Sequence, residues 1–212
     1  LQRTTVSYEI LLVDTASSDQ TLAIAKEFPV RIIHESRKGR NIAHQTGADN
    51  AKGVLLCFTE ADCQLPPNWI ETIAKAFETN PNSAAVVGRY VFIDSTPLYE
   101  WLSRIILPIG DTLFRLIHGH YSLRASNFTI RKAVLHDVGG FNPLAREFDD
   151  VELGMRVARK RVITYVPNLV VYTRDRRIAG RITTYLQELL GNYVRTVILR
   201  QVIHKKMYAD IR

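Results

Sequence analysis

The feature that most restricts the fold is an unbroken apolar run, Val54–Phe58, which is followed almost at once by Glu60-Ala61-Asp62. A run of this length between turn signals is typical of a strand buried on both faces of a parallel sheet. Ligands bind at the carboxyl edge of such open α/β sheets. The sequence therefore predicts two carboxylates at the ligand-binding edge of a central strand.

The spacing of these two acids suits a hard divalent cation. Side chains two residues apart on an extended chain point to the same side, so Glu60 and Asp62 can face one ligand. Mg²⁺ is usually held by one or two carboxylates and completed by substrate phosphates and water. Short acidic patterns are common, and the alternative is that both acids only solvate a loop.

Apolar runs alternate with helical spacing on either side of this stretch. Strands are expected over Glu9–Val13 and Val30–His34, and helices over Thr21–Phe28 and Ile42–Ala51. Ser17 or Ser18 is expected to cap the first of these helices. The resulting order predicts an α/β fold, in which a mostly parallel sheet with right-handed crossovers is flanked by helices.

The remaining chain continues the pattern with one unusual segment. Leu98–Gly119 is apolar with helical spacing but contains Pro108 and Gly110, which predicts a helical hairpin or a bent amphipathic helix over the site. The other expected elements are a strand over Ala84–Ile93, an extended segment over Tyr121–Ile130, helices over Lys132–Val138 and Arg146–Lys160, and short strands over Ile163–Val166 and Leu169–Tyr172.

The positive charge is concentrated at the C-terminal end. The chain of 212 residues carries a net charge of +7, and residues 174–212 alone hold nine Lys or Arg against three acids. We therefore expect one α/β domain over 1–173 and a basic amphipathic helical tail over 174–212. This distribution argues against a nucleic-acid partner and for a local anionic one, a phosphate group or the membrane surface.

Cysteine usage and hydropathy bear on the compartment. Cys57 and Cys63 form no disulfide framework or metal spacing, which suits a reducing compartment. No apolar run reaches the length of a membrane span, and no signal-peptide pattern is present in residues 1–212. These features predict a cytoplasmic location, with contact to the inner face of the membrane through the basic tail as an open alternative.

Three motifs in order resemble those of the inverting family 2 glycosyltransferases of the GT-A fold. The segment ending in Asp14, Ser17, Asp19 and Thr21 resembles their first acidic motif. The stretch containing Glu60 and Asp62 is similar to their Asp-x-Asp region. A third segment resembles the family's acceptor-side motif: Val138-Gly-Gly-Phe141 followed by Asp149-Asp150-x-Glu152-Leu153-x-x-Arg156.

The resemblance implies roles for individual acids. Asp14 would contact the nucleoside of a nucleotide-sugar donor, most commonly one linked to uridine diphosphate. Asp62, with Glu60 in the position of the first acid, would hold the Mg²⁺ or Mn²⁺ that bridges the donor diphosphate. Asp150 would be the catalytic base that activates a saccharide or lipid-linked acceptor, and the sugar would be transferred with inversion.

Further residues are expected to bind substrate. Asn127 falls where related enzymes carry a polar residue near the donor or acceptor, and Asp149 lies beside the expected base. Lys38 lies in a basic loop, and Arg176 and Arg177 follow a strand, in the position of basic residues near the diphosphate.

Four departures leave a second reading open. Glu60 stands where the family usually has Asp, Thr15 stands where a second Asp commonly follows Asp14, and His44-Gln45 stands where the family usually has Arg-Asn. The family's first strand and helix should precede Glu9, so the chain is expected to be N-terminally incomplete. The alternative is a catalytically silent glycosyltransferase-like module that binds a partner or a membrane.

Overall fold

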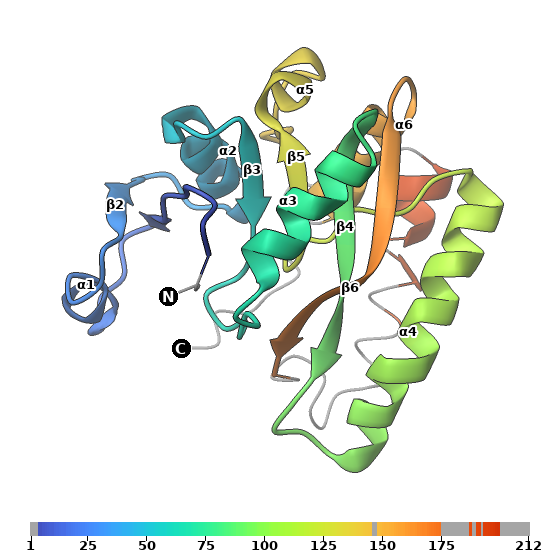
Figure 1. Cartoon of the computed structure of the whole chain (residues 1–212), viewed down its shortest axis with the longest axis horizontal. Helices are drawn as coiled ribbons and strands as arrows, with labels where there is room; N and C mark the ends of the chain where they lie inside the picture. Colours follow the sequence, from blue (N-terminus) through green and yellow to red (C-terminus); the bar gives the residue numbers. More distant parts are fainter. Residues whose placement is uncertain (1–3, 146–147, 175–186, 188–189, 192, 200–212) are drawn as a thin grey trace.

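The computed structural model describes residues 4–145, 148–174, 187, 190–191 and 193–199, in which strands and helices alternate (Figure 1). The strands are β1 Leu11–Asp14, β2 Arg31–His34, β3 Leu55–Phe58, β4 Ser83–Phe92, β5 Phe128–Arg131 and β6 Val162–Thr173. The helices are α1 Thr21–Ala25, α2 Arg40–Asn50, α3 Trp69–Thr79, α4 Pro97–His118, α5 Lys132–Asp137 and α6 Asp149–Ala158, with a π-helical turn η1 Val194–Ile198. This order confirms the predicted α/β class.

The strands form two sheets that differ in strand direction. β1 and β2 pair in parallel, and the larger sheet has the order β3-β5-β4-β6. β5 runs antiparallel to both of its neighbours, whereas β4 and β6 are parallel. Three of the four strands in the larger sheet therefore run the same way, which confirms a mostly parallel sheet.

Helices cover both faces of the larger sheet. On one face, α3 packs Trp69, Ile73 and Phe77 against β4 and β6. On the other face, α2, α5 and α6 pack their apolar side chains against β3, β4 and β5, around the fully buried Phe128. Burial of aromatic and branched side chains on both faces stabilises the sheet that carries the acidic motifs.

β3 differs from the expected central strand. It lies at the edge of the larger sheet because β5 is inserted between β3 and β4. Leu56 and Phe58 are buried, but Cys57 is exposed, so β3 is buried mainly on one face. The apolar run could not reveal this, because a continuous run does not fix which neighbours a strand has.

Two proline-containing segments are continuous elements. α4 is one helix through Pro108, which excludes the predicted hairpin and agrees with the alternative of an amphipathic helix. β6 is one long strand through Pro167, and it bulges where its register with β4 shifts between Val87 and Arg89. Gly88 lies opposite this bulge, where a Cβ would overlap the carbonyl oxygen of Leu169. A bulge lets a strand carry a proline that a regular ladder would not accept.

Smaller corrections concern helix ends. The residue preceding α1 is Gln20, without a side-chain cap, so the predicted capping by Ser17 or Ser18 is wrong. Most of the predicted basic tail, including Ile182, lies outside the described residues. Within the described part of the chain, no helix is both long and apolar enough to cross a membrane.

Candidate active site

A basic loop leads into α2 and is anchored by a buried acid. Glu35 accepts hydrogen bonds from the Arg37 guanidinium at 2.9 and 2.7 Å and from the Thr46 hydroxyl at 2.6 Å. These contacts, the Arg37 guanidinium first, hold the pKa of Glu35 well below its usual range. Arg37 is therefore used to fix the loop, and Lys38 remains exposed beside it.

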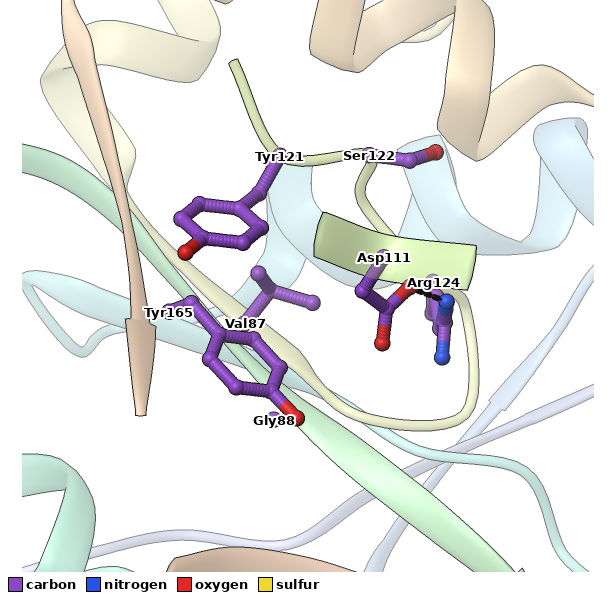
Figure 2. A pocket seen from close by; sticks show the side chains of 7 residues that line it. All are labelled: Val87, Gly88, Asp111, Tyr121, Ser122, Arg124 and Tyr165. Carbon is purple, nitrogen blue, oxygen red and sulfur yellow. Dashed lines mark ion pairs between the residues drawn. The ribbon is translucent and has the colours of Figure 1, made fainter. Parts of the chain in front are cut away.

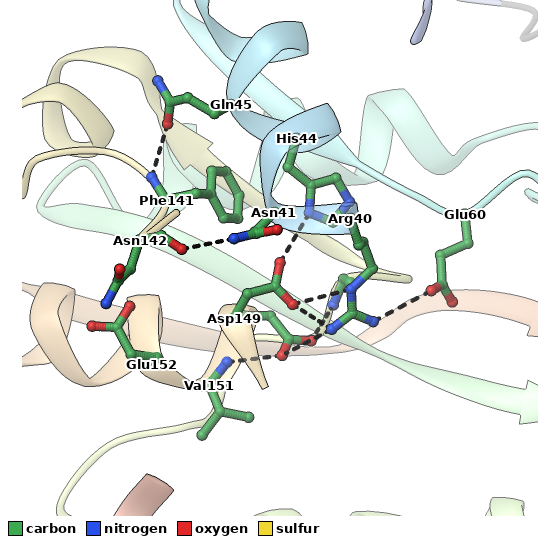
Figure 3. Close-up of polar contacts among 12 residues, drawn as sticks. Arg40, Asn41, His44, Gln45, Glu60, Phe141, Asn142, Asp149, Val151 and Glu152 are labelled. Carbon is green, nitrogen blue, oxygen red and sulfur yellow. Dashed lines mark hydrogen bonds and ion pairs between the residues drawn. The ribbon is translucent and has the colours of Figure 1, made fainter. Parts of the chain in front are cut away.

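Arg40, the first residue of α2, connects the two acidic motifs (Figure 3). Its Nε donates to Asp149 Oδ1 at 3.0 Å, and its Nη2 also pairs with that oxygen. Its Nη1 lies 3.7 Å from Glu60 Oε1, and its Nη2 lies 3.9 Å from Asp150 Oδ1. One guanidinium thus joins the acid after β3 to both acids at the start of α6.

The charges in this cluster stabilise one another. Burial opposes the charge of Arg40, but Asp150 and Asp149 outweigh it and hold the arginine's pKa above its usual range. Burial would likewise raise the pKa of Asp149, which has no exposed surface. The His44 ring and the Arg40 guanidinium reverse that effect, so the pKa of Asp149 is lowered. Both groups are therefore ionised in the folded protein.

The same face of α2 holds the loop that precedes α6. Gln45 Oε1 accepts the backbone N–H of Phe141 at 2.8 Å, and Asn41 Nδ2 donates to the carbonyl of Asn142 at 2.8 Å. The His44 ring lies 3.3 Å from Asp149 Oδ2 and also packs against Phe141. His44 and Gln45, the pair that departs from the family pattern, thus position the acceptor-side motif.

Asp150 is less buried than its neighbour Asp149. Its side chain is 14% exposed, against none for Asp149. Asp150 Oδ2 accepts the backbone N–H of Ala125 at 2.7 Å, and Oδ1 accepts that of Val151 at 2.9 Å. These bonds fix the carboxylate at the helix N-terminus, where negative charge is favoured, while leaving it an accessible edge.

The predicted cation ligands lie together after β3. One ligand atom from each of Glu60, Asp62 and Cys63 lies within 4.8 Å of the others, and the three residues are at least partly exposed. Burial raises the pKa of the Cys63 thiol, so this group stays protonated and is a poor ligand for a hard cation. The two carboxylates remain, and they match the oxygen ligands that Mg²⁺ or Mn²⁺ prefers.

Two other predicted residues lie elsewhere. Asp14 ends β1 in the smaller sheet, where the hydroxyl and backbone amide of Ser17 lower its pKa and His34 lies 3.7 Å away. Asn127 is fully buried. Its amide group donates to the carbonyls of Arg89 and Leu169 at 2.9 Å and accepts from the Trp69 indole at 3.0 Å.

These contacts give Asn127 a structural role in place of the expected substrate contact, because every donor and acceptor of its amide is already paired inside the protein. Arg176 and Arg177 lie outside the described residues.

Sequence reasoning missed Arg40, the residue that connects the site. The sequence alone does not distinguish the three basic side chains of this loop. In the fold, Arg37 pairs with Glu35, Lys38 is exposed to solvent, and Arg40 pairs with Asp149. The position of Arg40 at the start of a helix was a usable signal, because a cation is disfavoured there unless acids compensate it.

The order of the motifs matches a known family. Residues 1–151 match Glycosyl transferase family 2. The chain belongs to this family. The match covers Asp14, the acids after β3 and the start of α6. The GT-A fold expected from the resemblance agrees with the structural comparison.

Curated relatives and a solved structure extend the match. Glycosyltransferase AglE of Haloferax volcanii is 25% identical over 68% of this chain, which spans 59% of that protein. Dolichol-phosphate mannosyltransferase of Pyrococcus furiosus is 30% identical over 66% of this chain and 42% of its own length. The structure of mannosyltransferase PcManGT of Pyrobaculum calidifontis with GDP-Man and Mn²⁺ aligns with a TM-score of 0.62 and 17% identity, over 90% of this chain and 55% of that one.

Proposed function

We propose that the protein transfers a sugar from a nucleotide-sugar donor to a hydroxyl of a saccharide or lipid-linked acceptor, with inversion at the anomeric carbon. The observation that carries the proposal is the position of Arg40 between Glu60 and the acids of α6. This arrangement brings a donor-side acid and an acceptor-side acid to a single guanidinium, so that two substrates bound at these acids would be held side by side.

Asp150 is the base in this proposal. The acceptor oxygen attacks the anomeric carbon and forms the new glycosidic bond, while its proton passes to the carboxylate of Asp150. The bond from the anomeric carbon to the diphosphate breaks, and its electron pair leaves with the nucleoside diphosphate. The bonds from the Ala125 and Val151 amides keep the carboxylate in place during this transfer.

Glu60 and Asp62 are the cation ligands in this proposal. A bound Mg²⁺ or Mn²⁺ would neutralise the charge of the donor diphosphate. Arg40 contributes a fixed positive charge near the same acids. The mannosyltransferase from Pyrobaculum calidifontis was solved with GDP-Man and Mn²⁺, and the relative from Pyrococcus furiosus is a dolichol-phosphate mannosyltransferase. Both names support this substrate class for the present chain, and uridine and guanosine donors are both candidates.

The first test measures nucleotide binding. In the full-length protein, UDP or GDP with Mn²⁺ is expected to raise the melting temperature, and a chelator is expected to remove the effect. If neither nucleotide shifts the transition with or without Mn²⁺, the transferase proposal fails and the silent-module reading replaces it.

The second test addresses the base. The Asp150→Asn protein is expected to keep the nucleotide-induced shift but to lose transfer from UDP-glucose or GDP-mannose to a polyprenyl-linked monosaccharide by about 10²-fold or more. Transfer that survives in this variant would contradict the assignment of Asp150. Glu78→Gln serves as a matched control, because it also turns an acid into an amide and Glu78 is exposed on α3, away from the acids of the site.

A further inference from the structure

Helix α4 presents apolar side chains to solvent along its whole length. Figure 1 shows it along one side of the molecule, on the opposite side from β1 and β2. Its inner face is buried at Ser103 and Asp111. Its outer face exposes large apolar side chains that are each 45% to 71% exposed: Leu98, Trp101, Ile105, Ile106, Ile109, Leu113, Leu116 and Ile117.

These side chains form one continuous stripe. They recur at three and four residues over 22 residues, so they share one side of a helix about 33 Å long. Single exposed apolar residues are ordinary, but a contiguous apolar patch of this kind marks an interaction surface. We call this set of eight residues the α4 stripe.

The charges of α4 favour an anionic partner for the stripe. Both acids of the helix are withdrawn from solvent, since Glu100 is half-buried and Asp111 is buried in an ion pair with Arg124. Arg104 and Arg115 are exposed. Because they lie eleven residues apart, about three turns, both fall on the same margin of the helix.

Buried contacts fix which way the stripe faces. Figure 2 shows Asp111 beside Arg124, above Val87 and Gly88 of β4. The rings of Tyr121 and Tyr165 stack there at 5.0 Å, and the Arg115 guanidinium lies over Tyr121 at 5.4 Å. These polar and aromatic contacts hold the inner face against the sheet, so the stripe cannot turn inward without breaking them.

We propose that the α4 stripe docks the protein on an anionic lipid surface, with the helix lying in the plane of the interface. The apolar side chains would enter the boundary between headgroups and acyl chains. Arg104 would reach the headgroup phosphates along one margin, and Arg115, whose guanidinium lies over Tyr121, would add its positive charge close to the same margin, with both aliphatic stems beside the apolar side chains. A second copy of the chain fits less well, because Asp111 is buried and Glu100 is half-buried, so α4 offers these arginines little acidic surface with which to pair.

The connection to the active site rests on the proposed function. The segment after α4 carries Arg124, which pairs with Asp111, and Ala125, whose N–H binds Asp150. Docking through α4 would therefore place the acceptor-side acid a short stretch of chain from the lipid surface. An acceptor carried by a membrane lipid fits this placement better than a free sugar in solution.

Vesicle binding tests the docking surface without donor, metal or acceptor. The full-length protein is expected to sediment with vesicles of phosphatidylcholine mixed with phosphatidylglycerol. Ile109→Asp with Leu113→Asp is expected to reduce binding on the order of tenfold or more. Ile24→Asp with Phe28→Asp is the matched control, because these side chains are 52% and 55% exposed outside α4, and this variant should bind as the unchanged protein does.

The arginines are tested separately from the stripe. Arg104→Gln with Arg115→Gln is expected to weaken binding to the anionic vesicles and to remove most of its salt dependence, with little effect on vesicles of phosphatidylcholine alone. Equal loss on both kinds of vesicle would overturn the role assigned to the arginines.

Two results would overturn the proposal as a whole. One is that the unchanged protein does not bind either kind of vesicle. The other is that it forms a dimer by light scattering that Ile109→Asp with Leu113→Asp dissociates, which would assign the stripe to a second copy. Since the nucleotide-induced melting shift is measured without lipid, it separates a failure of docking from a failure of the proposed transferase.

Discussion

The two acidic motifs differ in how much of their binding capacity the protein itself uses. At the start of α6, Asp149 is fully buried and engaged by Arg40 and His44, and Asp150 accepts two backbone amides. After β3, Glu60 is 28% exposed and Asp62 is exposed. Arg40 lies close to both motifs, so the difference in burial between them does not come from one motif being farther from this arginine.

This difference assigns the two motifs to different tasks. A buried carboxylate whose partners are all protein groups is costly to form and costly to disturb, and so it holds a geometry. Carboxylates that solvent reaches, as at Glu60 and Asp62, cost less and can exchange water for a cation that binds a substrate phosphate. The fold therefore preorganises the acids of α6 with charge and leaves the acids after β3 more open to solvent; under the proposed function these are the acceptor side and the donor side.

The largest expected effect separates Asp149 from its neighbour Asp150. Asp149→Asn removes the charge that compensates the buried part of Arg40, and is expected to lower the free energy of unfolding by about 3 kcal/mol. Asp150→Asn keeps an acceptor for the Ala125 amide and should cost about 1 kcal/mol or less. Chemical denaturation of both variants measures the two values.

Equal losses in these two variants would contradict the comparison, because adjacent acids of the same helix would then share one role. A parallel assay of nucleotide-induced stabilisation at a temperature where both proteins are folded shows whether either loss extends to the donor side.

Much of the fold could be predicted from the sequence because local pattern and burial agree. The runs that became β1, β2 and β4 are apolar, of strand length and bounded by turn residues, and these strands formed close to the expected positions. Pro108 kept a helical hairpin open as an alternative to the single amphipathic helix that formed. Proline breaks a helix when the freed carbonyl has no partner, but on a half-exposed helix water can serve as the partner.

The placement of β5 between β3 and β4 could not be predicted from the sequence. This placement puts β3 at the edge of the larger sheet. Antiparallel insertion of β5 between β3 and β4 depends on contacts over 70 residues apart, such as Leu55 opposite Arg131. No local periodicity contains that information, so an apolar run that suggested a central strand became an edge strand.

The site shows the same limit at the level of side chains. Acids could be predicted because their motifs are short and ordered along the chain. The roles of Arg40 and Asn127 depend on partners distant in sequence, Asp149 for Arg40 and Trp69 and Leu169 for Asn127. The composition of a loop or strand cannot show whether a polar side chain faces a ligand or forms its hydrogen bonds inside the protein.

A smaller effect is expected at Glu35, a buried acid that is paired with an arginine outside the acidic motifs. Its pKa is lowered by Arg37 and Thr46, so its contribution to stability is complete above its usual pKa of roughly 4.3 and is lost as pH falls toward the lowered value. Glu35→Gln is expected to lower the melting temperature by roughly 2–4 °C at pH 7. The difference from the unchanged protein should shrink between about pH 5 and pH 3.

A difference that stays constant across this pH range would mean that the ionised form of Glu35 is not what the loop requires. Thr46→Val is the matched control, since it removes one hydrogen bond to Glu35 without removing the charge. Its effect should be smaller than that of Glu35→Gln and should change with pH in the same direction.

The smallest expected effect on stability, and the most informative about the donor side, is at Asp62. Asp62→Asn alters an exposed side chain, so the free energy of unfolding should change by less than about 0.5 kcal/mol without ligand. The same variant should lose the additional stabilisation that Mn²⁺ gives in the presence of UDP or GDP, because an amide replaces a carboxylate ligand for a hard cation.

Glu78→Gln is a matched control, because Glu78 is an exposed acid on α3, away from the motifs. A large loss of stability in Asp62→Asn without ligand would show that the acids after β3 hold the fold as those of α6 do, and the division of tasks between the two motifs would then be wrong.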